Sequence, residues 1–284
     1  MTVWLPTQHM LELSWVTLLG LLVGSFLNVL IYRLPVMMER AWARDCAALT
    51  DVPLPQEERF NLLLPRSRCG RCGHTLSWYE NIPVVSFLAL RGRCVACKTA
   101  LAWRYPLVEL TCAALFAYCA QRWGISPAGG AWALFGCLLL ASALIDWDTT
   151  YLPDDLTLPM LWLGLLSASL GYSGVGLNDA LWGAVAGYGS LWSVFWVFKL
   201  LTGKDGMGYG DFKLFAALGA WFGWIALVPL ILAASCSGAV VGLAMRWRGG
   251  LREGGVVPFG PFLAGAGAMA MVLEPRLLAH WVLT

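Results

Sequence analysis

Carboxylates at the ends of apolar stretches are the residues of this chain best suited to chemistry. Asp146 ends one such stretch, in Ser142-Ala-Leu-Ile-Asp146, and Asp211 opens another after Gly206-Met-Gly-Tyr-Gly210. Two carboxyl groups brought face to face cannot both ionise, so one keeps a proton while the other activates a water molecule. Because aspartyl hydrolysis of an amide requires this arrangement, Asp146 and Asp211 are the candidate catalytic pair.

The scarcity of histidine argues against other hydrolytic mechanisms. The chain has three histidines: His9 and His280 lie near its ends, and His74 lies in a polar segment. A Ser–His or Cys–His enzyme within the apolar segments would therefore lack its base. The sequence contains no HExxH helix, no Walker loop and no GxGxxG after a strand, so zinc proteases of that type and nucleotide-binding enzymes are also disfavoured.

The acidic residues also have simpler interpretations. Asp211 can serve as the N-cap of the following helix, and Asp146 can be an interfacial charge. Glu109, inside an apolar stretch, can pair with a cation or line the site. Three residues of the short turn 146–155 can likewise be simply solvated: Asp148, Asp154 and Asp155. Asp179 is one more carboxylate at the edge of an apolar stretch. The glycines before Asp211 have their own use, since they let a substrate backbone approach closely.

Four of the nine cysteines form a second chemical group. Cys69 and Cys72 make one CxxC hook, and Cys94 and Cys97 make another after 21 intervening residues. Paired hooks are typical of tetrahedral zinc sites, although this separation slightly exceeds the usual spacing of about 15 to 20 residues. Four thiolates leave no position for water, so such a zinc is structural. Two disulfides, a redox CxxC, or His74 replacing one ligand are the alternatives.

The other five cysteines are expected to be inert. Cys46 has no obvious partner in the sequence. The remaining four lie within apolar stretches and read as small buried residues: Cys112, Cys119, Cys137 and Cys236.

Composition indicates that these residues are positioned by membrane helices. The 284-residue chain is 59% hydrophobic, is 13% charged and has a mean hydropathy of +0.67, whereas soluble domains are about one quarter charged. A span needs about 20 apolar residues. Stretches with little or no charge cover 11–32, 105–121, 124–145, 156–178, 180–198, 214–245 and 256–273. The sixth is too long for one span and is expected to turn near Gly223-Trp224 or Pro229. This predicts an all-α protein with about eight transmembrane helices.

The distribution of Lys and Arg predicts the orientation. With residues 33–104 in the cytoplasm, eight spans place all 19 Lys and Arg residues there except Arg122 and Arg276. Both termini are then outside, and Asp146 and Asp211 lie at the cytoplasmic boundary. Seven spans would move the cations of 246–252 outward, which favours eight. Because no Lys or Arg precedes Arg33, the first 32 residues are expected to be a retained helix rather than a signal peptide.

These observations predict three parts. Residues 1–32 form the first transmembrane helix, residues 33–104 a cytoplasmic insertion with the tetracysteine zinc knuckle, and residues 105–284 the transmembrane core. Within the insertion, 37–48 is expected to be helical and basic, 51–65 a linker, and the apolar segment 78–88 to pack on the membrane surface or the helix bundle. A transporter or assembly factor is the non-enzymatic alternative, but no repeat relates the two halves and the carboxylates cluster at one face.

Several motifs, in order along the chain, resemble those of the type IV prepilin peptidases, which belong to the GxGD aspartyl proteases. Gly208-Tyr-Gly-Asp211 resembles the GxGD motif, and Asp146 followed by Leu152-Pro-Asp154 resembles the segment of the other catalytic aspartate. The CxxC hooks also resemble the family pattern. Similar too are Leu22-Val-Gly-Ser-Phe-Leu-Asn28, Glu80-Asn-Ile-Pro-Val-Val-Ser86, Arg104-Tyr-Pro-Leu-Val-Glu109 and Val257-Pro-Phe-Gly-Pro-Phe262.

The resemblance implies a bifunctional, multi-pass enzyme of the bacterial inner membrane with its active site at the cytoplasmic face. Such enzymes cleave the basic leader from type IV prepilins and type II secretion pseudopilins after a glycine, then methylate the new N-terminal residue with S-adenosylmethionine. The lipid bilayer is the other implied partner, with no role for nucleic acid. No residue spacing in the sequence marks a binding site for the methyl donor. This site is expected to involve the cytoplasmic insertion. Family members without the tetracysteine insertion exist that are specialised for cleavage alone, so its presence here favours the bifunctional form.

Overall fold

The computed structural model describes residues 6–50, 59–204, 206–248 and 257–273. Within them the regular secondary structure is helical, and the extended pairings are two isolated bridges, Arg68 with Thr75 and Arg93 with Ala100. The all-α class is therefore confirmed. Outside the described residues lie 51–58 of the expected linker, together with Arg252, Arg276 and His280. The chain divides into two compact units, Met1–Ser126 and Pro127–Thr284.

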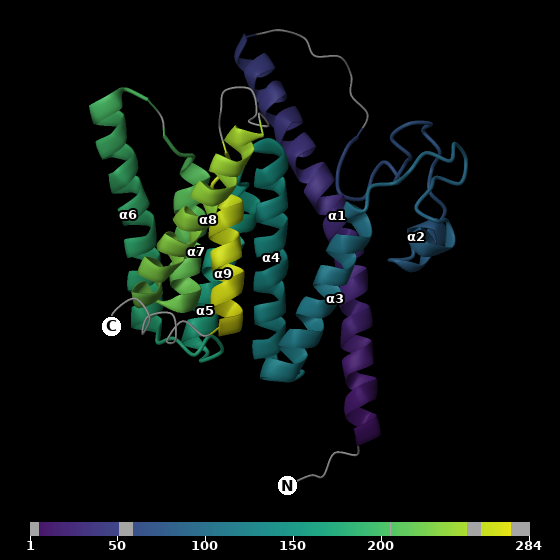
Figure 1. Ribbon diagram of the computed structural model, residues 1–284, viewed down its shortest axis with the longest axis horizontal. Helices are drawn as coiled ribbons and strands as arrows, with labels where there is room; N and C mark the ends of the chain where they lie inside the picture. Colours follow the sequence, from purple (N-terminus) through teal and green to yellow (C-terminus); the bar gives the residue numbers. More distant parts are fainter. Residues whose placement is uncertain (1–5, 51–58, 205, 249–256, 274–284) are drawn as a thin grey trace. The chain divides into compact units, whose positions relative to one another are not determined.

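The first unit is built on two packed helices, α1 (Pro6–Thr50) and α3 (Arg104–Trp123). The segment of the chain that connects α1 to α3 contains the short helices η1 (Trp78–Asn81) and α2 (Val85–Ala89). Helix α1 continues without a break past Tyr32 and Pro35, so the helical, basic segment expected at 37–48 is the last part of the first helix (Figure 1). Arg33 is buried and ties α1 to the insertion by donating to the backbone carbonyls of Asn61 and Pro65 at 2.8 and 2.6 Å.

The second unit surrounds one apolar helix. Its elements are α4 (Pro127–Thr149), α5 (Asp154–Ser169), α6 (Leu177–Thr202), α7 (Tyr209–Phe222), α8 (Leu227–Trp247) and α9 (Gly260–Leu273). Helix α7 packs on α5, α6 and α9, and α9 also contacts α4 and α8 (Figure 1). Every residue of α7 from Leu214 to its end is buried. An all-round apolar surface is what a central helix requires.

Four helical segments are long and apolar enough to cross a membrane: Met10–Thr50, Pro127–Thr149, Leu177–Thr202 and Trp224–Trp247. The shorter apolar helix Gly260–Leu273 lies at the last expected span, and α3, α5 and α7 lie at the others. The architecture is thus that of a membrane protein. The count of eight spans stays a prediction, since α7 has 14 residues and rises about 21 Å against a hydrocarbon core of about 30 Å.

The expected break in the long apolar stretch 214–245 is confirmed. Helix α7 ends at Phe222, a 3-10 turn covers Trp224–Ala226, and α8 begins at Leu227. Gly223 between them has φ +81°, a conformation that favours glycine over residues with a Cβ. The turn therefore occurs at the first of the two expected positions, because glycine makes the left-handed backbone accessible there.

Candidate active site

The structure brings together the two aspartates that the sequence singled out. Asp146 lies in the last turn of α4 and Asp211 in the first turn of α7, and both are buried, with 4% and 7% of their surface exposed. The charge of Asp146 acts on Asp211, so the two carboxyl groups are close enough to repel each other when both ionise. Two carboxyl groups that interact in this way are able to share one proton.

Asp211 is not the N-cap residue of its helix. The N-cap of α7 is Gly208, which places Asp211 at the third helical position, so the N-cap interpretation of Asp211 is wrong. Its Oδ1 atom is buried and has no hydrogen-bond partner among the described residues. A buried carboxyl oxygen without a partner is costly and rare, and it persists where function demands it.

Leu152 lies between the glycines that flank the aspartate pair. A Cβ atom on Gly210 would lie 2.5 Å from the Leu152 Cβ. A Cβ atom on Gly260, the first residue of α9, would lie 2.6 Å from Asp146 Oδ2 and 2.9 Å from Leu152 Cδ1. The absence of a Cβ at these two positions is therefore what lets α7, α9 and the loop before α5 close around the carboxyl groups.

An ion pair joins the helices beside the aspartates. Lys213 on α7 donates through Nζ to both carboxylate oxygens of Asp154, the first residue of α5, at 2.6 and 2.7 Å. The contact holds the start of α5, and with it Leu152, against the start of α7. The solvated interpretation of Asp154 is thus incomplete, because this side chain is half exposed but paired.

Three further acidic residues of the second unit are exposed: Asp148, Asp155 and Asp179. The solvated interpretation fits Asp155, whereas Asp148 also has an interaction within the protein. Sequence reasoning overlooked Ser142, whose fully buried hydroxyl lies one helical turn before Asp146 on α4 and has no hydrogen-bond partner among the described residues. The available signal was its spacing of four residues from Asp146, which places both side chains on one helix face.

Glu109 has a structural partner in the first unit. Its carboxylate is buried, accepts a 2.7 Å hydrogen bond from the backbone N–H of Val84, and interacts with the Ser25 hydroxyl. Val84 has φ +58°, an unusual conformation for a β-branched residue. A backbone donor therefore takes the place of the cation that was one expected partner. The contact holds the segment before α2 against α3.

The four cysteines of the hooks form a compact cluster. Their Sγ atoms lie within 4.8 Å of one another; Cys69 and Cys97 are 3.7 Å apart, and Cys72 and Cys94 are 3.9 Å apart. Tetrahedral coordination with Zn–S bonds of about 2.3 Å requires sulfur atoms about 3.8 Å apart. All four thiols are free, and these separations are far beyond a disulfide bond of about 2.05 Å. The donor set fits a thiophilic metal, and the two-disulfide alternative is wrong.

The two hooks repeat the same backbone structure. Gly73 donates its N–H to the carbonyl of Cys69, and Lys98 does the same to Cys94. Both donors have positive φ, +72° and +56°. Hydrogen bonds with the Thr99 hydroxyl and with the Thr99 backbone lower the pKa of Cys97 to about 6, whereas burial and the neighbouring thiols raise the pKa of Cys72 to about 11.

His74 lies beside the cluster but contacts another group. Its Nε2 lies 3.2 Å from Glu80 Oε2. A hydrogen bond from the Ser77 backbone N–H lowers the pKa of Glu80, and the hydrogen bond with His74 lowers it further. This carboxyl group therefore remains an anion beside the imidazole. The metal-binding group comprises the four cysteines, and His74 contacts the first hook through its backbone carbonyl, which accepts a 2.8 Å hydrogen bond from the Cys69 N–H, rather than replacing a ligand.

Comparison with known proteins identifies the family of the chain. Residues 18–123 match the Bacterial Peptidase A24 N-terminal domain, and residues 133–243 match the Type IV leader peptidase family. No solved structure matches the chain.

Three relatives named Prepilin leader peptidase/N-methyltransferase align along most of the chain. The protein of Pseudomonas aeruginosa is 54% identical over 90% of this chain and 88% of its own length. The protein of Stutzerimonas stutzeri is 52% identical over 93% of this chain and 91% of its own length. The protein of Aeromonas salmonicida is 48% identical over 100% of this chain and 99% of its own length. At this identity and coverage, the chain belongs to the type IV leader peptidase family.

Proposed function

We propose that this chain is a bifunctional membrane enzyme. It removes the basic leader from type IV prepilins and type II secretion pseudopilins, then methylates the new N-terminal amine with S-adenosylmethionine. The relatives carry both activities in their name and align over nearly the whole chain. The observation that carries the peptidase assignment is the buried Asp146 and Asp211 pair, in which Asp211 Oδ1 has no hydrogen-bond partner among the described residues.

In the proposed mechanism the two carboxyl groups hold one proton between them. The ionised carboxylate removes a proton from water as the water oxygen attacks the scissile carbonyl carbon, and the protonated carboxyl donates to the carbonyl oxygen. Collapse of the tetrahedral intermediate breaks the C–N bond, and the leaving amine takes a proton from the pair. Burial of both groups strengthens each of these electrostatic interactions.

The proposed substrate is a membrane helix with a basic cytoplasmic leader. A peptide bond inside a helix is shielded by its own hydrogen bonds, so the cleaved segment must unwind, and the glycine before the scissile bond helps it to do so. The topology that serves this reaction is the eight-span one with residues 33–104 in the cytoplasm. It places the scissile bond at the depth of Asp146 and Asp211, at the inner edge of the bilayer.

The proposed organisation assigns distinct roles to the three parts. Residues 1–32 anchor the chain, and residues 105–284 form the peptidase core. Residues 33–104 are the cytoplasmic insertion, in which Cys69, Cys72, Cys94 and Cys97 hold a structural zinc ion. When bound, zinc would supply cross-linking of the two hooks and no open coordination position for chemistry.

The direct test is incubation of the purified enzyme with a prepilin carrying a basic leader, with and without S-adenosylmethionine. We expect a shortened product in both cases and a methylated N-terminal residue only with the donor, as measured by intact mass and peptide sequencing. A product that is shortened but never methylated would identify an enzyme specialised for cleavage. An unprocessed substrate would refute the peptidase assignment.

A further inference from the structure

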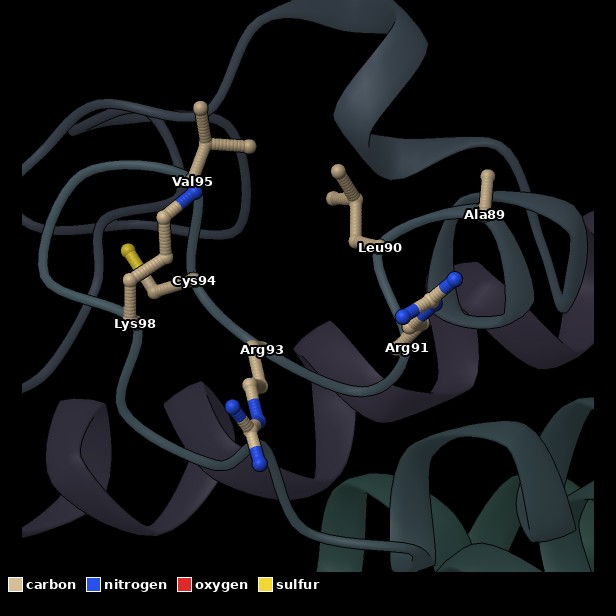
Figure 2. Close-up of a pocket in the computed structure, with 7 residues that line it drawn as sticks. All are labelled: Ala89, Leu90, Arg91, Arg93, Cys94, Val95 and Lys98. Atoms are coloured by element: carbon tan, nitrogen blue, oxygen red, sulfur yellow. The ribbon is translucent and has the colours of Figure 1, made fainter.

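The second CxxC hook borders a pocket that the proposed chemistry does not use. The pocket has a volume of about 390 Å³ and is lined by Ala89, Leu90, Arg91, Arg93, Cys94, Val95 and Lys98. Figure 2 shows Lys98 at the left and Arg91 at the right of the pocket, with Arg93 below and between them and Val95 and Leu90 above. Three cations and several apolar side chains thus line the pocket.

The charge of this pocket favours an anion. Arg91, Arg93 and Lys98 are exposed, and among the residues that the structure describes their side chains make no ion pair or hydrogen bond. No lining residue is acidic. S-adenosylmethionine does not fit this pocket, because its ammonium and sulfonium groups outnumber its single carboxylate and give it a net positive charge, which the three cations repel. An unpaired cluster of cations instead attracts phosphate or a comparable anion.

Helix α2 ends at Ala89, which lines the pocket, and carries exposed apolar side chains. Val85 and Leu88 on this helix are 60% and 64% exposed, and Ile82 just before it is 38% exposed. On the opposite side, Phe87 is buried against Trp103, with ring centroids 4.9 Å apart. Helix α2 thus packs one face, with Phe87, against the rest of the insertion. Its other face, with Val85 and Leu88, is apolar and has no packing partner among the described residues.

The hydrogen bond between Glu109 and Val84 sets the depth of this surface. Val84 immediately precedes α2, and its N–H lies 2.7 Å from Glu109 Oε2. Glu109 lies five residues after Arg104, about 7.5 Å into an apolar stretch of α3 that is expected to enter the bilayer. The start of α2 is therefore held at the edge of the membrane, where apolar side chains meet acyl chains and nearby cations meet headgroups.

We propose that α2 and the adjoining pocket form a binding site for an anionic phospholipid of the cytoplasmic leaflet. Arg91, Arg93 and Lys98 bind the headgroup phosphate, and Ile82, Val85 and Leu88 contact the acyl chains. The site anchors the zinc-binding module to the membrane next to α3. The inference goes beyond the proposed enzymatic function and uses only its membrane topology.

The headgroup contact is tested by measuring retention of phosphatidylglycerol and phosphatidylcholine on the full-length protein by native mass spectrometry. A variant combining R91Q, R93Q and K98Q is compared with a matched control combining R66Q, R68Q and R71Q, which removes equal charge from the first hook. We expect the first variant to lose phosphatidylglycerol affinity by about fivefold per cation, since each cation near an anionic surface contributes about 1 kcal/mol. The control and phosphatidylcholine retention should change less than about twofold.

Two results of this measurement would overturn the proposal. One is equal loss in both variants, which would show only non-specific attraction by net charge. The other is displacement of phosphatidylglycerol by millimolar inorganic phosphate, which would identify a site for a free anion.

The apolar contact is tested by placing a photoreactive amino acid at Leu88 and, as a control, at Leu49, which is 86% exposed at the end of α1. In native membranes we expect lipid adducts from position 88 and none from position 49. Protein adducts at position 88 would show that this face binds a polypeptide and would overturn the proposal. Because both tests measure lipid contact and not catalysis, their failure leaves the peptidase assignment intact, and loss of peptidase activity leaves them unaffected.

Discussion

Lys213 Nζ donates to both carboxylate oxygens of Asp154, at 2.6 and 2.7 Å, and so joins the first turns of α7 and α5. Asp211 lies two residues before Lys213, and Leu152 lies two residues before Asp154. The ion pair therefore positions both a carboxyl group of the candidate site and the side chain that packs beside it.

Replacing Lys213 by Met should impair cleavage more than stability. An exposed ion pair contributes about 0–1 kcal/mol to folding, whereas a displacement of about 1 Å in a catalytic group can cost up to about 100-fold in rate. We expect kcat to fall about 10- to 100-fold while the melting temperature changes by only a few degrees. The double variant K213M/D154N should be no worse than either single variant, and additive losses would argue against a shared role.

Replacing Asp146 or Asp211 by Asn should abolish leader removal without preventing membrane insertion. Asn keeps the shape of the side chain but cannot exchange the proton, which removes general acid–base catalysis worth about 100- to 10,000-fold. The matched control is D148N, two residues after Asp146 and exposed. Processing of a prepilin is followed by gel mobility. Normal cleavage by either variant would exclude these residues as the catalytic pair.

Replacing Gly260 by Ala should also reduce cleavage strongly. The new Cβ would lie 2.6 Å from Asp146 Oδ2, closer than real Cβ contacts allow, so the carboxyl group must move. Gly265 on the same helix has nothing within 4 Å of its Cβ direction, and G265A is the matched control. We expect G260A to lower kcat by about 100-fold and G265A to leave it unchanged. Comparable kcat values in the two variants would show that Gly260 does not shape the site.

Replacing Cys69 by Ser should release the bound metal. Removing one of four thiolates opens the coordination shell, and zinc content measured by elemental analysis should fall from about one ion per chain towards zero. C46S is the control, because Cys46 is exposed on α1 and lies outside the cluster. If C69S kept its full zinc content, the metal would have to be bound elsewhere.

Replacing Glu109 by Leu should free the segment before α2, whereas Gln should retain it. Leu leaves the Val84 N–H without an acceptor, at a cost of about 1–3 kcal/mol, while the Gln carbonyl can still accept the bond. Hydrogen exchange at the Val84 amide measures the difference directly. We expect fast exchange in E109L and near-normal protection in E109Q. Equal protection in all three proteins would show that the contact does not hold this segment.

Much of the fold and the identity of the candidate residues follow from local signals. The length of an apolar stretch predicts a helix, and the spacing of two CxxC hooks predicts the sulfur cluster. An overlong stretch predicts a break near Gly223 or Pro229, between which the structure decides for Gly223. Asp146 and Asp211 were recognisable because few other groups in the apolar segments can do proton chemistry. Each of these inferences uses residues that are near one another in the chain or a choice among very few candidates.

Only the tertiary structure decided how those residues are held. The contacts of Leu152 with Gly210 and Gly260, the Lys213–Asp154 ion pair, and the bond from Val84 to Glu109 join segments 25 or more residues apart. Sequence periodicity does not predict which side chains contact each other across such distances, because these contacts depend on how whole helices pack. For the same reason, the position of Asp211 inside its helix, and not at the cap, became evident only once the backbone of Gly208 was in place.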